Sequence, residues 1–273
     1  MTGVVAATTA YSLDTYRSLL ELAQQQGYRF VSFLEAPDAL PKSIYLRHDI
    51  DFSVTAAVEL ARVNAALGVQ GTFFVLLRSE IYNVLSPRAL ESVGELRRLG
   101  QRLAFHCWAP SLGDRDALAR AVLEDFSVLQ TALRPVDRVF SWHNPSGSSV
   151  EGRIDLEVPT LVNAYGGRFA HEIRYVSDSN MRNSVADLCA HLRNDAADSL
   201  QLLLHPINWV VGGESVADML AGAWRYVIRD REHGMRTNGV YDAIFPAGMS
   251  DTLVADFAEM WRRSAATQGQ PPR

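Results

Sequence analysis

Short β-favouring apolar runs alternate with amphipathic helical segments along most of the chain, and this alternation limits the fold more than any other feature. Alternating strands and helices are typical of a parallel sheet with helices outside it. The number of such units in 273 residues favours closure into a barrel over an open doubly wound sheet. No G-x-G-x-x-G motif follows the first strand, so dinucleotide binding has no support. The expected strands cover residues 43–47, 71–76, 102–105, 136–141 and 200–204, and the expected helices cover residues 12–26, 53–67, 87–99, 116–133, 215–229 and 252–263.

Charge and cysteine usage exclude several classes of protein. The net charge is −5 and no basic run is interleaved with aromatic residues, so we expect no nucleic-acid partner. Cys107 and Cys189 lie far apart and form no C-x-x-C pair, which argues against a disulfide framework and a structural zinc knuckle. Residues 1–10 lack the basic segment of a secretion signal, and the apolar run 200–204 is too short to span a membrane. These features predict a soluble cytoplasmic protein.

Side chains that can bind metals or transfer protons follow the ends of several expected strands. Asp49 and Asp51 follow the first strand, His106 follows the third, His143 follows the fourth, and His205 follows a later one. The carboxyl ends of parallel strands form the functional face of β/α folds. Because these positions share one edge of the expected sheet, the sequence predicts an active site there.

Asp49 and Asp51 are two residues apart, so on an extended chain their side chains point to the same side. Two carboxylates held that close repel each other unless a cation or a proton lies between them. A divalent metal, with one aspartate as its ligand and the other as a base, removes this conflict. The alternative is a pair of residues at a helix N-terminus. Each of His106, His143 and His205, taken alone, is more typical of a structural role than of a ligand, and only the joint pattern favours chemistry.

The segments that carry these residues resemble motifs of the polysaccharide deacetylases, the NodB-like family also called carbohydrate esterase family 4. Leu46–Asp51 resembles the Asp-x-Asp variant of the family's first motif, and Leu202–Pro206 resembles the motif with the catalytic histidine. The segment after Arg174 is similar to one of an intracellular bacterial subgroup. All of them occur in the family's order between Ile44 and Trp209. In chain order they are Leu46–Asp51, Gly68–Val75, Arg102–His106, Phe140–Gly147, Tyr175–Ser179 and Leu202–Pro206.

The resemblance implies a distorted (β/α) barrel of seven strands that forms a single domain over residues 1–273, with core motifs in 44–209 and a tail at 265–273. It also implies a metal-dependent amide hydrolase. In that enzyme Asp49 is the general base, Asp51 and His106 are metal ligands, and His205 is the general acid.

One departure from the family pattern concerns the metal ligands. The family's second motif is usually His-x-x-x-His and supplies two ligands, but Pro110 stands where the second histidine is expected. A catalytic zinc ion usually has three protein ligands and a water molecule. We therefore expect His143, from the neighbouring strand end, to be the third ligand, and zinc to be the metal.

The missing secretion signal makes an extracellular glycan a poor substrate candidate, so we expect a small N-acetylated or N-formylated metabolite such as an amino sugar. Trp142, Asn144 and Trp209 lie near the motifs and are expected to contact it. Trp108 and Tyr165 are also near the motifs, and each of these aromatic residues could either stack on a sugar face or pack in the core. Arg47 is expected to hold an anionic group of the substrate, and Asp178 to bind the substrate or to orient a catalytic group.

Three other functions stay open. A cyclic amide or imide hydrolase would use the same fold and metal. A catalytically silent binding protein is favoured by Pro110 and opposed by the joint presence of a base and an acid. A metal-free hydrolase could use Cys107 as its nucleophile, although the sequence shows no clear partner to activate it.

Overall fold

A computed structural model describes residues 10–35, 42–108, 114–145, 154–193, 199–252 and 255. The chain divides into two compact units, Met1–Met219 and Leu220–Arg273. All expected site residues belong to the first unit. The expectation of a single domain stays a prediction, and the expected tail at 265–273 lies outside the described residues.

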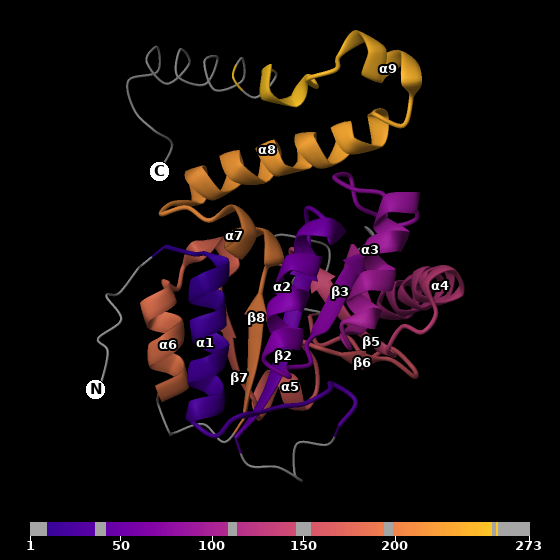
Figure 1. Ribbon diagram of the computed structural model, residues 1–273. Helices are drawn as coiled ribbons and strands as arrows, with labels where there is room; N and C mark the ends of the chain where they lie inside the picture. Colours follow the sequence, from indigo (N-terminus) through magenta and orange to yellow (C-terminus); the bar gives the residue numbers. More distant parts are fainter. Residues whose placement is uncertain are drawn as a thin grey trace, which may run out of the picture. The chain divides into compact units, whose positions relative to one another are not determined.

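The first unit is built on a parallel sheet whose seven main strands follow the order β6-β5-β4-β3-β2-β8-β7 (Figure 1). An eighth strand, β1, lies off this path and pairs in parallel with β2. Strands β6 and β7 are the two ends of the hydrogen-bonded path, so the sheet curls without closing. This arrangement confirms the expected distorted barrel. The strands are β1 (Arg29–Phe30), β2 (Ser43–Ile50), β3 (Thr72–Leu76), β4 (Arg102–Trp108), β5 (Val139–His143), β6 (Val162–Asn163), β7 (Arg174–Ser177) and β8 (Ser199–Leu204).

Several expected helices begin where the side chain of a serine or aspartate accepts a hydrogen bond from a free backbone N–H group of the first turn. Ser12, Ser53, Ser86 and Asp114 each cap a helix in this way. The expected helix at 252–263 lies almost wholly outside the described residues, and β7 and α6 were not expected from the sequence. The helices are α1 (Leu13–Gln25), α2 (Val54–Ala66), α3 (Pro87–Arg98), α4 (Arg115–Leu133), α5 (Arg168–His171), the 3₁₀ helix η2 (Ser179–Met181), α6 (Val185–Arg193), α7 (Pro206–Val211), α8 (Val216–Met235) and α9 (Gly239–Ile244).

Alternation along the strands separates a helix-facing core from the barrel interior. In β2 every residue is buried, and Ile44, Leu46 and Ile50 join the large core between the sheet and the helices. Tyr45 belongs instead to a small cluster that fills the inside of the barrel together with Phe74. Arg47 and Asp49 share the strand face of Tyr45. The same two-residue period therefore places polar side chains inside the barrel, above an apolar floor.

No helix in the described parts of the chain has the length and apolar character needed to cross a bilayer. The expected cytoplasmic location stays a prediction.

A buried polar network fixes β2 to the helices on its outer side. His48 is fully buried, with Nε2 3.1 Å from the Tyr16 hydroxyl and Nδ1 3.3 Å from the Leu204 carbonyl oxygen. The Tyr16 hydroxyl also donates to Oδ1 of Asn64. Burial lowers the pKa of His48 to about 3. The imidazole is therefore neutral in the folded protein at every pH above that value.

This burial predicts that the protein loses stability in mild acid. Below pH 6.5 the unfolded chain protonates His48 while the folded protein does not, so acid favours unfolding by up to about 1.4 kcal/mol per pH unit until the folded pKa is reached. Urea unfolding between pH 7 and pH 4 measures this slope for the wild type and for His48→Gln. The stability advantage of the wild type over His48→Gln should shrink as the pH falls. A difference that does not change with pH would contradict the prediction.

Candidate active site

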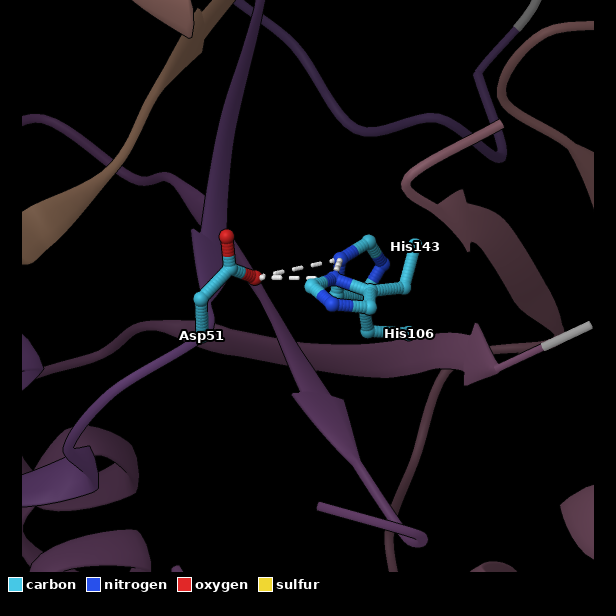
Figure 2. Close-up of side chains that lie close together, drawn as sticks. All are labelled: Asp51, His106 and His143. Carbon is cyan, nitrogen blue, oxygen red and sulfur yellow. Dashed lines mark hydrogen bonds and ion pairs between the residues drawn. The ribbon is translucent and has the colours of Figure 1, made fainter. Parts of the chain in front are cut away.

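Three side chains meet where β2, β4 and β5 end (Figure 2). Asp51 follows the last residue of β2, His106 lies in β4, and His143 is the last residue of β5. Oδ1 of Asp51 lies 3.3 Å from Nε2 of His106 and 3.3 Å from Nδ1 of His143. The two ring nitrogens are 3.2 Å apart. The third ligand expected from the neighbouring strand thus lies within reach of the other two, while Pro110 lies outside the described residues.

The donor set and its surroundings fit a divalent cation. Oδ1 of Asp51 is buried, yet it accepts no hydrogen bond of regular geometry within the described structure. Ligand atoms that surround a tetrahedral zinc ion at about 2.0–2.1 Å lie roughly 3.3 Å from one another, which matches these three atoms. Burial raises the pKa of Asp51, but the neighbouring His106 and His143 hold it well below its usual range. A buried, ionised carboxylate oxygen that accepts no regular hydrogen bond is well suited to bind a cation.

The opposite ring nitrogen of His106 is held by the protein. Its Nδ1 lies 2.8 Å from Oγ of Ser141, which belongs to β5. Because one ring nitrogen is engaged in this way, the other is left to face the site. Sequence reasoning missed Ser141, although its position two residues before His143 places it on the same face of β5.

Asp49 is held by Arg47 from the same strand. Nε of Arg47 donates to Oδ1 of Asp49 at 2.8 Å, and Nη2 donates to Oδ2 at 2.6 Å. Arg47 is fully buried, its Nη1 donates to Gln201, and its guanidinium lies over the ring of Tyr165. Burial raises the pKa of Asp49, but the charge and hydrogen bonds of Arg47, together with the nearby His106 and His205, lower the pKa below its ordinary value. The structure therefore places Arg47 behind the expected base, and its guanidinium is not exposed to a substrate anion.

His205 and Asp178 form a second pair at the same edge of the sheet. Nδ1 of His205 lies 2.6 Å from Oδ1 of Asp178, and Nε2 lies 3.8 Å from Oδ2 of Asp51. Asp178 is fully buried and also accepts hydrogen bonds from the side chains of Asn208 and Trp209. Burial lowers the pKa of His205, but the charge and hydrogen bond of Asp178, together with the charges of Asp51 and Asp49, raise it to about 9. Of its two expected roles, Asp178 has the geometry for orienting a catalytic group.

The remaining expected contact residues divide between core and surface. Trp142 is fully buried in the helix-facing core, and its Nε1 donates to the carbonyl of Ile154. Trp209 is 1% exposed, and its indole N–H is used by Asp178. Asn144 is exposed, with Nδ2 3.1 Å from Nε2 of His143. Of these three expected contact residues, only Asn144 is both exposed and in contact with a candidate ligand, His143.

Among known proteins, this chain is similar to solved structures only. No protein-family model matches the chain, and no curated protein matches its sequence. The chain is similar to the carbohydrate esterase family 4 domain of a multidomain xylanase from the hindgut metagenome of Trinervitermes trinervoides, with a TM-score of 0.41 and 16% identity over 70% of this chain and 83% of that one. It is also similar to the chitin deacetylase of Colletotrichum lindemuthianum, with a TM-score of 0.42 and 16% identity over 68% of this chain and 83% of that one.

A third similar structure is a pseudoenzyme of the same family from Bacillus anthracis, with a TM-score of 0.40 and 13% identity over 68% of this chain and 60% of that one. These structures belong to the family that the motifs resemble. Because all three TM-scores are below 0.5, a function for this chain must be supported by its own side-chain geometry.

Proposed function

We propose that this protein is a metal-dependent N-deacylase that removes an acetyl or formyl group from an amino sugar or a related small metabolite. One observation carries the proposal. The buried Oδ1 of Asp51 has no regular hydrogen bond, and it lies 3.3 Å from each of two histidine nitrogens. Asp49, a candidate general base, and His205, a candidate general acid, lie on different strands beside this cation site. Amide hydrolysis requires this combination of groups.

Asp51, His106 and His143 would hold a divalent cation, which would supply Lewis-acid chemistry that lowers the pKa of water and stabilises a developing oxyanion. Asp49 then accepts the proton of the attacking water. Both of its oxygens accept a hydrogen bond from Arg47, but a carboxylate oxygen has a second lone pair. Oδ2 of Asp49 lies 3.5 Å from Nε2 of His106, so the base is next to the ligand set.

His205 supplies the proton that the leaving amine needs. Asp178 accepts from Nδ1 and fixes the ring, which leaves Nε2 to face Asp51. Protonated His205 can therefore donate from Nε2 to the amide nitrogen as the C–N bond breaks. Asp178 stays buried behind it, as an orienting group.

The geometry disfavours two of the alternatives. A silent binding protein has no use for an Arg47-bound carboxylate and an Asp178-bound imidazole on either side of one cation site. Cys107 is 1% exposed on the helix-facing side of β4, and burial raises the pKa of its thiol, so the thiol stays protonated and unreactive. A cyclic amide or imide hydrolase would use the same residues and is separated by substrate profiling.

Elemental analysis of protein purified without chelators, combined with a substrate screen, tests the proposal. We expect about one divalent metal per chain, as for a three-ligand site, and release of acetate or formate from N-acyl amino sugars. Ring opening of cyclic imides without such release would favour the second hydrolase. A protein that holds no metal and takes none up on reconstitution would contradict the proposal.

A further inference from the structure

We propose that Trp108 is the residue that selects the substrate, because its indole forms a platform for the apolar face of a pyranose ring beside the cation site. This inference rests on the proposed deacylase function and specifies it. The substrate is then a cyclic N-acyl amino sugar unit, and an acyclic N-acyl amine binds poorly.

The exposure of Trp108 is the first observation. Trp142 and Trp209, two of the other tryptophans near the motifs, are at most 1% exposed. Trp108 is 44% exposed although it belongs to a central strand of the sheet. An indole left in water at the end of a central strand is a surface that a ligand can cover.

The position of Trp108 is the second observation. Trp108 lies two residues after His106 on β4, so the strand period places both side chains on the barrel face. It is also the register partner of His143 on β5. The indole and imidazole centroids are 5.0 Å apart and the rings are inclined by 33°, so the indole lies against one of the three ligands.

The chemistry of the site favours a neutral sugar over an anionic ligand. The carboxylates of Asp49, Asp51 and Asp178 gather there, and the guanidinium of Arg47 is already used by Asp49. A pyranose presents C–H groups on one face, which pack on an indole, and hydroxyl groups at its edge, which bind polar atoms. A ring seated on Trp108 would bring an N-acyl group attached to it towards His143.

Two matched probes test this assignment. Methyl N-acetyl-β-glucosaminide contains a pyranose, and N-acetylethanolamine is the acyclic fragment of the same substrate. We expect the wild type to prefer the pyranoside. In Trp108→Ala the ratio of kcat/KM for pyranoside to acyclic amide should fall about tenfold or more, chiefly through KM, and Trp108→Phe should lie between the two. Metal content is measured for each variant.

Trp224→Ala is the matched control, since Trp224 is also 44% exposed but belongs to the second compact unit. It should keep the wild-type ratio. If Trp108→Ala lost its metal and kcat/KM fell by the same factor for both probes, Trp108 would only pack on His143. That result would overturn the inference. A wild type that hydrolyses both probes equally would overturn it and leave the deacylase function intact. A metal-loaded wild type that hydrolyses neither probe, nor their N-formyl counterparts, would remove both.

Discussion

Replacement of Asp51 by alanine is expected to remove the bound cation and to lower turnover by about a thousandfold or more, because it deletes one of three ligands and the Lewis acid with it. The folded state should tolerate the change. Oδ1 of Asp51 accepts no regular hydrogen bond in the described structure, so its removal breaks only the looser contacts with His106 and His143 at 3.3 Å. Elemental analysis and steady-state kinetics measure the two expected losses, and thermal unfolding of the metal-free proteins measures the stability.

Asp14→Ala is a suitable control for this experiment, because Asp14 is an exposed aspartate in the first turn of α1. It should keep both metal and turnover. Equal metal content in Asp51→Ala and in the wild type would show that Asp51 is not a ligand. In that case the close approach of His106 and His143 would need another explanation, such as a hydrogen-bonded histidine pair.

Asp49→Asn is expected to keep the cation while turnover falls by roughly 10²–10⁴-fold, the usual range for loss of a general base. The amide has the shape of the carboxylate but cannot accept a proton from water. It also faces the guanidinium of Arg47 with one oxygen in place of two, so some loss of stability is expected through the weakened buried pair. Metal content, kcat and the thermal unfolding midpoint together measure these three effects.

The contrast between the two variants is more informative than either one alone. If Asp49→Asn lost the metal as completely as Asp51→Ala, Asp49 would be a ligand, and the base would have to be found elsewhere. If Asp49→Asn kept wild-type turnover, the proposed proton transfer would be wrong even with a metal present.

The order of the elements could be predicted from the sequence because it depends on local patterns. Runs such as 43–47 and 71–76 predicted strands that the structure contains, and Ser53 was expected to cap the helix that begins at Val54. Strand alternation also determines which side of the sheet a residue of β5 faces. Trp142 lies between Ser141 and His143, so its side chain had to face the helices and not the site.

The pairing of the site residues could not be predicted in the same way. Asp178 follows β7, a strand that the sequence did not predict, and it reaches His205 only because β7 and β8 are neighbours in the sheet. Arg47 was expected to bind substrate, but Tyr165 and Gln201, which are distant in sequence, enclose it beside Asp49. Both outcomes depend on which strands are adjacent and in which register.

The sequence by itself determined the β/α alternation, the helix caps and the set of acidic and histidine side chains at the strand ends, because backbone propensity, capping and the two-residue strand period act within a few residues. The tertiary structure alone decided that His143 reaches Asp51, that Arg47 is held by Asp49, and that Trp108 stays exposed while Trp142 is buried. These outcomes follow from strand order and curl, which bring together residues far apart in the chain and are set by the packing of the whole sheet.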